Sequence, residues 1–249
     1  MSENQQKLAV LIDADNASPK QVADLFGEIA KFGTAFVRRI YGDWTTDQLK
    51  GWKKDLPEYA IQPIQQFAHT TRKNSTDSAM IIDAMDLLYT GRFDAFCLVT
   101  SDSDFTRLAS RIREDGLDVY GFGARKTPAP FRNACTTFVY LDSQNASKST
   151  NKTENPEQRL EKRRTELMKQ FNGNAGLIKA IRETIADISD DDGWARLGPL
   201  GSKVRNAWPD FLPRNYGFSR LSDLLERSHL FELRKGSSGI FEVRDRKPS

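Results

Sequence analysis

The chain has 249 residues, of which 38% are hydrophobic and 29% charged, and this is enough for one large or two smaller globular domains. No apolar run approaches the roughly 20 residues of a membrane helix, and the first residues, MSENQQK, lack the order of a secretory signal, so we expect a cytoplasmic protein with no membrane contact. Cys97 and Cys135 lie in apolar segments and only two histidines are present, which argues against a disulfide framework, a zinc site and a histidine-rich metal site.

Strand-like and helix-like segments alternate over the first 142 residues. Continuous apolar runs predict strands at 8–12, 35–41, 60–67, 95–100, 117–122 and 138–141. Helical periodicity follows Pro19 and returns at 48–56, 76–89 and 105–115. This alternation predicts an α/β domain, a parallel sheet flanked by helices, over residues 1–142.

The composition changes after Asp142. Residues 143–158 contain no aliphatic side chain larger than alanine, so we expect a flexible charged linker over 143–171, in which RLEKRRTELMKQF is suited to a charged helix. From 172 to 249, three amphipathic helical segments precede the hairpin LFELRKGSSGIFEVR, and this order predicts a small winged-helix domain. Basic residues outnumber acidic ones after residue 142 but not before it, which favours an active-site domain followed by a domain that meets a polyanion.

Acidic residues follow the first and fourth expected strands. Asp13 and Asn16 come after LAVLI, Asp102 and Asp104 come after FCLVT, and Asp77 begins the helix between them. Because the carboxyl ends of parallel strands meet at one edge, these side chains converge if the two strands are neighbours. Converging carboxylates repel one another unless a cation lies among them, and hard oxygen ligands favour Mg²⁺ or Mn²⁺. Such a site predicts metal-assisted hydrolysis of phosphodiester bonds.

Helix capping is the alternative explanation of these acids, since an aspartate at a helix N-cap or in a first turn is ordinary. Each motif alone is compatible with a cap, whereas their joint occurrence favours a metal site. Asp83 and Asp86 share one face of their helix, away from Asp77, and are expected to be solvated or ion-paired. Asp94 is expected to be a turn residue.

The motifs LIDADNA, a lysine four residues before Asp77, and VTSDSDF resemble the NYN domains of the PIN-like nuclease superfamily over about residues 7–142. The resemblance implies a five-stranded α/β sheet and an acidic pocket that binds Mg²⁺ or Mn²⁺ and cleaves RNA. It places metal ligands at Asp13, Asp77, Asp102 and Asp104, with Asn16 beside the pocket. Ser103 stands where the family often has glycine.

DADNA also resembles the DxD motif of haloacid-dehalogenase-type phosphatases, in which the first aspartate is a nucleophile. That motif usually continues with threonine or valine and a hydrophobic residue, whereas Asn16 and Ala17 stand here. It also leaves Asp77 unexplained. The phosphatase is therefore the less favoured enzyme.

The segments LGPLGSKV, PDF, YGFSRLSDLLE and GIFEVR resemble the OST-HTH, or LOTUS, domain over about residues 172–246. The resemblance implies a winged helix that binds RNA or docks a protein partner. Candidates for contacts with RNA are Lys203, Arg205, Arg214, Arg220 and Lys235 for phosphates, and Tyr216 or Trp194 for stacking on bases. In the first domain, Arg72 and Lys73 are candidates for holding the substrate phosphate.

The sequence therefore predicts a ribonuclease that depends on Mg²⁺ or Mn²⁺, with an RNA-binding or docking domain at its C-terminus. The alternative from another class is a non-catalytic RNA-binding or scaffold protein with the same fold. The presence of all four acids favours the enzyme.

Overall fold

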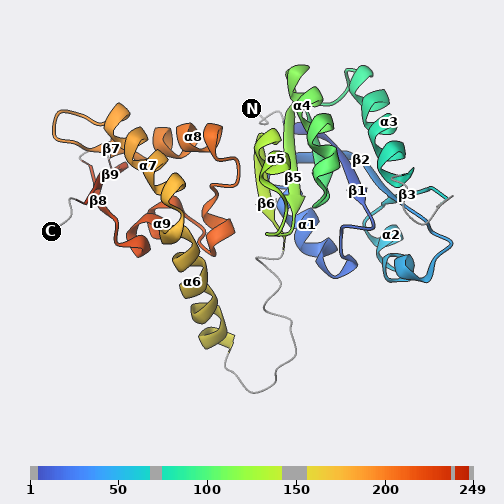
Figure 1. The fold of residues 1–249 in the computed structure, drawn as a ribbon, viewed down its shortest axis with the longest axis horizontal. Coiled ribbons are helices and arrows are strands. Elements are labelled where there is room, and N and C mark those ends of the chain that lie inside the picture. Colours follow the sequence, from blue (N-terminus) through green and yellow to red (C-terminus); the bar gives the residue numbers. More distant parts are fainter. Residues whose placement is uncertain (1–4, 68–74, 142–155, 237–238, 247–249) are drawn as a thin grey trace. The chain divides into compact units, whose positions relative to one another are not determined.

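The computed structural model describes residues 5–67, 75–141, 156–236 and 239–246 (Figure 1). The chain divides into two compact units, Met1–Asp142 and Ser143–Ser249. None of the described helices is both long and apolar enough to cross a membrane.

The first unit is built on a six-stranded parallel sheet. Its strands are β1 (Gln6–Asp13), β2 (Gly33–Gly42), β3 (Gln62–Gln65), β4 (Ala95–Val99), β5 (Asp118–Gly123) and β6 (Thr137–Tyr140). They lie in the order β3-β2-β1-β4-β5-β6, so β1 and β4 are central neighbours, as the site hypothesis required. The sheet confirms the predicted α/β fold, with one strand more than the five that the NYN resemblance implied.

Helices cover both faces of this sheet. The helical segments are η1 (Pro19–Gln21), α1 (Val22–Ile29), η2 (Asp47–Trp52), α2 (Asp55–Glu58), α3 (Ser75–Tyr89), η3 (Ser103–Phe105), α4 (Thr106–Glu114) and α5 (Ala129–Ala134). Residues of α3, α4 and α5 share one apolar cluster with Leu11 and Phe96. Val10 and Cys97 alternate with those two along their strands and are also fully buried. Two buried faces explain why β1 and β4 are continuous apolar runs.

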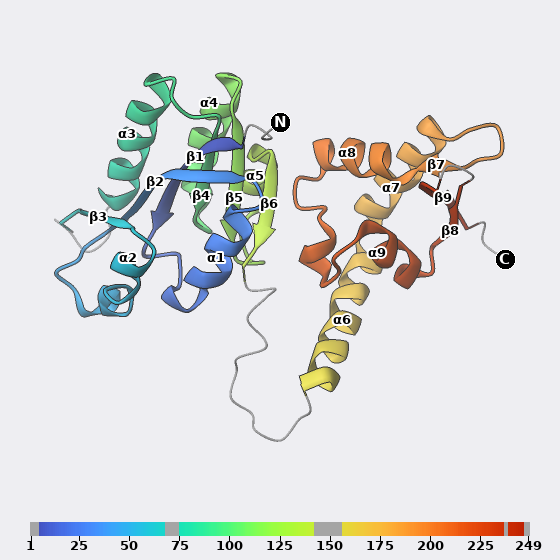
Figure 2. The ribbon, with the colours of Figure 1, turned by 180° about the vertical axis from the view of Figure 1, so that it is seen from behind.

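The second unit combines helices with a small antiparallel sheet (Figure 2). Its elements are α6 (Pro156–Gly173), α7 (Ala175–Ile188), β7 (Ala195–Arg196), α8 (Leu197–Ala207), η5 (Pro213–Tyr216), α9 (Leu221–Ser228), β8 (Phe231–Lys235) and β9 (Phe241–Asp245). The three expected helices and the hairpin are present, and β7 adds a third strand beside β9. Phe211 is buried and Trp208, Phe218 and Leu221 pack against the same core.

The linker expected over 143–171 is too long at its C-terminal end. Helix α6 begins at Pro156, and its residues Leu167, Met168 and Phe171 are buried in the core of the second unit. Phe171 stacks on Phe211 with ring centroids 6.4 Å apart. The sequence of α6 is dominated by charged residues, so it resembles a solvated helix. Its short apolar face of three residues did not indicate that the helix packs on the domain core. The rest of the expected linker, 143–155, lies outside the described residues.

Candidate metal centre

Asp13 is a buried carboxylate at the last position of β1, and only 1% of its surface is exposed. Its Oδ1 accepts the backbone N–H of Asp15 at 3.0 Å. Its Oδ2 accepts hydrogen bonds from Asn16 Nδ2 at 2.7 Å and from Thr100 Oγ1 at 2.9 Å. Burying a charged group is costly unless it is hydrogen-bonded, and these donors satisfy both oxygens. The geometry therefore fixes Asp13 at the carboxyl edge of the sheet.

Thr100 connects Asp13 to the loop that follows β4. It is 1% exposed, and its hydroxyl donates to Asp13 while accepting the backbone N–H of Asp102 at 3.1 Å. Asp102 is the N-cap of η3 and accepts the backbone N–H of Asp104 at 3.0 Å. This chain of hydrogen bonds sets the positions of two acids relative to the buried one.

Asp77, Asp102 and Asp104 form a cluster in which each offers a carboxylate oxygen within 4.8 Å of the others. Asp77 lies in the first turn of α3, and the other two lie around the start of η3. The structure thus brings together three of the four predicted ligands. Asp13 is not a member of this cluster, although its negative charge acts on Asp77.

Unbalanced negative charge marks this edge of the sheet. Burial, followed by the charges of Asp13, Asp102, Asp104 and Asp15, raises the pKa of Asp77 to about 6. The pKa of Asp15 is also raised, first by burial and then by Asp13 and Asp43. A cation placed among these oxygens would offset the repulsion, and carboxylate oxygens suit Mg²⁺ or Mn²⁺. The donor set therefore fits a hard divalent ion.

Several sequence candidates have other roles in the structure. The side-chain amide of Asn16 donates a hydrogen bond to Asp13, so Asn16 orients that carboxylate. Asp83 pairs with Arg39 and accepts the hydroxyl of Tyr41, in agreement with its expected role as an ion-paired residue. Asp94 accepts the backbone N–H of Lys7 at 2.7 Å, which is a structural contact.

Arg72 and Lys73, the candidates for substrate phosphate, lie outside the described residues. Thr100 was not a candidate from the sequence, although a hydroxyl directly before SDSD at the end of a strand was a usable signal. Asp43, at the end of β2, was also missed. It lies near enough to Asp15 to raise the pKa of that carboxyl group.

The candidate RNA contacts of the second unit differ in their surroundings. Arg205, Arg220 and Lys235 are exposed, and Arg214 is half-buried. Lys203 is ion-paired with Asp187 at 2.6 Å.

The two aromatic candidates for stacking on bases are not open platforms. Tyr216 is buried in the core, where its ring meets Phe171 edge-on with centroids 5.1 Å apart, so little of its ring is open to a base. The guanidinium groups of Arg234 and Arg244 lie 4.2 and 4.7 Å from the ring centroid of Trp194. Aromatic residues of a small core and exposed stacking residues have the same sequence signature, which is why burial was needed to separate them.

Comparison with known proteins identifies two domains in the order that the fold suggests. The sequence model of the NYN domain matches residues 7–142, and that of the OST-HTH/LOTUS domain matches residues 173–243. No curated protein matches the chain.

Two solved structures are similar to parts of the chain. A protein of unknown function from Vibrio parahaemolyticus is 20% identical, with a TM-score of 0.47, and the match covers 57% of this chain and 96% of that one. An uncharacterized protein from Nitrosomonas europaea is 34% identical, with a TM-score of 0.26, over 28% of this chain and 73% of that one.

Proposed function

The chain belongs to the NYN domain family, and on that premise we propose that it is a divalent-metal-dependent ribonuclease whose OST-HTH/LOTUS domain holds RNA. The observation that carries the proposal is the cluster of Asp77, Asp102 and Asp104, whose carboxylate oxygens lie within 4.8 Å of one another beside the buried Asp13. The NYN domain is a member of the PIN-like nuclease superfamily, which supports hydrolysis of nucleic acid.

Each acid has a distinct role in the proposed mechanism. Asp77, Asp102 and Asp104 would hold Mg²⁺ or Mn²⁺, which when bound stabilises charge at phosphorus and acidifies water. Asp13 supplies a fixed negative charge behind them, and its hydrogen bonds with Thr100 and Asn16 keep its orientation constant. Preorganised charges of this kind stabilise a transition state without rearrangement of the site.

The phosphatase alternative is disfavoured by the surroundings of Asp13. A nucleophilic aspartate needs an oxygen that can reach phosphorus, whereas both oxygens of Asp13 accept hydrogen bonds and the residue is 1% exposed. A non-catalytic RNA-binding protein is the remaining alternative, and the experiment below separates it from the enzyme.

The test compares the cleavage of single-stranded and structured RNA by the wild type and by Asp102→Asn, in Mg²⁺, in Mn²⁺ and in EDTA. We expect the wild type to cleave RNA in Mg²⁺ or Mn²⁺ but not in EDTA. The cleavage rate of Asp102→Asn should be lower by at least about 100-fold, as for other preorganised charged groups. Asp86→Asn is the matched control, because Asp86 is an exposed aspartate of α3 that lies outside the cluster.

Two outcomes would contradict the proposal. Equal cleavage by the wild type and Asp102→Asn would mean that a contaminant cuts the RNA. RNA binding without cleavage under every metal condition would favour the non-catalytic alternative.

A further inference from the structure

A basic turn lies directly beside the acidic cluster. Residues 124–127 follow β5, which is the neighbour of β4 in the sheet, so the turn starts about 5 Å from the end of β4. It contains Arg125 and Lys126 and no acidic residue. The segments that follow β1, β2 and β4 at the same edge carry aspartates instead, namely Asp15, Asp43, Asp102 and Asp104. The charge of this edge therefore changes sign between β4 and β5.

The turn is held firmly against the site. The backbone N–H of Ala124 donates to Ser101 Oγ at 2.9 Å, and Ser101 is the residue directly before Asp102. Thr127 closes the turn, since its backbone N–H and its Oγ1 donate to the carbonyl of Ala124 at 3.0 and 2.6 Å. At Gly123 a Cβ would lie 2.5 Å from the carbonyl oxygen of Thr100, so the two segments are packed too closely for a side chain there. The turn and the acidic loop are thus in direct contact.

The turn presents its two cations differently. The guanidinium group of Arg125 lies 4.8 Å from the ring centroid of Tyr140, which fixes its position. Lys126 is exposed.

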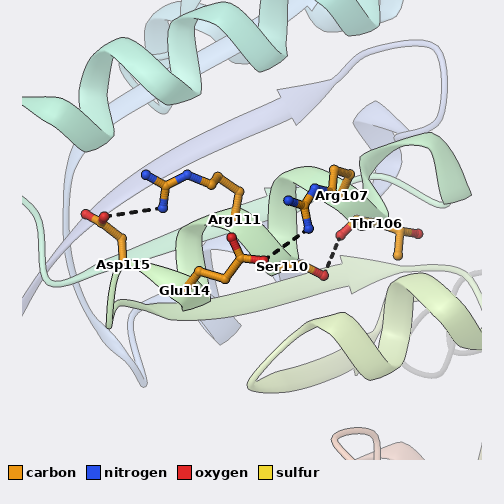
Figure 3. A network of polar contacts seen from close by, with 6 residues as sticks. All are labelled: Thr106, Arg107, Ser110, Arg111, Glu114 and Asp115. Carbon is orange, nitrogen blue, oxygen red and sulfur yellow. Dashed lines mark hydrogen bonds and ion pairs between the residues drawn. The ribbon is translucent and has the colours of Figure 1, made fainter.

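Two basic residues of α4, the helix after the acidic loop, form ion pairs with acids of the same segment. Arg107 is ion-paired with Glu114 at 3.0 Å and Arg111 with Asp115 at 3.3 Å (Figure 3). Both acids lie at the C-terminal end of α4, away from Asp102 and Asp104. The turn after β5 is therefore better placed than α4 to offer positive charge to a ligand at the acidic cluster.

We propose that residues 124–127 are a phosphate-binding element, in which Lys126, beside the fixed Arg125, binds a phosphate of the RNA next to the one that lies at the acidic cluster. The RNA strand then runs along the carboxyl edge of the sheet from β4 toward β5 and β6. This inference rests on the proposed function, because it takes RNA as the ligand of the acidic edge. A polyanion that approaches several aspartates needs such a cation close by, and the metal alone occupies only one point of the strand.

The test measures binding of a fluorescent single-stranded RNA to the full chain over a range of salt concentrations. All variants carry Asp102→Asn, so the RNA stays intact during the measurement. The slope of log K against log salt is negative, and the loss of one phosphate contact to a single strand reduces its magnitude by about 0.7. We therefore expect Lys126→Ala to reduce the magnitude of the slope by about that amount and to weaken binding several-fold. Lys126→Glu should weaken binding further. Lys126→Arg should retain the slope.

Lys7→Ala is the matched control. Lys7 is an exposed lysine near the start of β1, at the opposite edge of the same sheet. Unchanged binding by Lys126→Ala and Lys126→Glu would overturn the inference, and so would an equal loss in Lys7→Ala, which would indicate net charge alone. Since binding is measured without cleavage, absence of nuclease activity would contradict the proposed function and leave this test intact.

Discussion

The hydroxyl of Thr100 donates to Oδ2 of Asp13 at 2.9 Å, and the two residues, which are 87 positions apart in the chain, end neighbouring parallel strands. The same hydroxyl accepts the backbone N–H of Asp102. One buried threonine thus joins the acid at the end of β1 to the loop that carries two acids after β4. That hydroxyl group therefore helps to fix Asp13 and Asp102 relative to each other.

Thr100→Val should weaken metal binding while preserving the fold. Valine has the shape of threonine but cannot donate to Asp13 or accept from Asp102. A group that orients metal ligands typically contributes 10–100-fold to affinity, so we expect a loss of about that size for Mn²⁺, together with a stability loss of about 1–3 kcal/mol for the unpaired groups. Calorimetric titration with Mn²⁺ and thermal unfolding measure the two effects.

Thr100→Ser keeps the hydroxyl and should restore most of the affinity. Thr136→Val is the matched control, because Thr136 accepts the backbone N–H of Val119 at 3.0 Å and lies near the start of β6, at the opposite end of the strands from the site. Wild-type Mn²⁺ affinity in Thr100→Val would show that this hydroxyl does not position the acids.

The raised pKa of Asp77 predicts that its charge destabilises the metal-free protein. The pKa rises from a usual value near 3.8 to about 6, so the folded state binds the proton more tightly than the unfolded state. The free energy of unfolding therefore falls as the pH rises from about 4 to about 6 and stays lower above that range. In EDTA at pH 7.5, Asp77→Asn should melt at a higher temperature than the wild type, and the difference should shrink toward pH 4.

Added Mn²⁺ should reverse this order. The wild type gains about 2.7 kcal/mol when the metal is at 100 times its dissociation constant, whereas Asp77→Asn, having lost a ligand, gains less. Asp86→Asn, on the exposed face of the same helix, should follow the wild type in both conditions. If the melting temperatures of Asp77→Asn and the wild type differed by the same amount at every pH from 4 to 8, that would argue against repulsion at this site.

The alternation of apolar runs predicted the acidic edge on the condition that the first and fourth strands are neighbours, and the strand order meets that condition. It indicated a parallel sheet, and the carboxyl ends of such strands meet at one edge, so Asp13, Asp102 and Asp104 could be grouped before any coordinates. The bridge through Thr100 could not be predicted in the same way, because it requires the register in which Ile12 lies opposite Val99. The contact between Ala124 and Ser101 likewise depends on the packing of two loops, which leaves no periodic pattern in the sequence.

The second unit shows the opposite limit of sequence patterns. Its helices and hairpin were predicted from periodicity, but the side chains that fill its core were not fully separated from those on its surface. Phe171 and Tyr216 pack on each other, yet one was assigned to a linker and the other to an RNA surface. In a domain this small, a short apolar face on a charged helix completes the core, and composition alone does not reveal that.

Helix α6 should therefore be required for the stability of the second unit. Phe171 is fully buried and contacts Phe211 and Tyr216, so Phe171→Ala should cost about 3–5 kcal/mol by leaving a cavity. Leu160→Ala is the control, because Leu160 lies on the same helix and is 50% exposed. Chemical denaturation of residues 156–249 measures both. Equal stability of the two variants would mean that α6 does not complete the core.

The final prediction concerns which side chains of the second unit meet RNA. Arg220 is exposed at the N-cap of α9, whereas the charge of Lys203 is offset by Asp187 at 2.6 Å. Arg220→Ala should therefore weaken RNA binding and reduce the magnitude of the slope of log K against log salt by about 0.7. Lys203→Ala should change that slope less. Titration of a labelled RNA with the full chain measures both variants. Equal losses of affinity and of salt dependence in Arg220→Ala and Lys203→Ala would mean that the ion pair with Asp187 does not keep Lys203 from RNA.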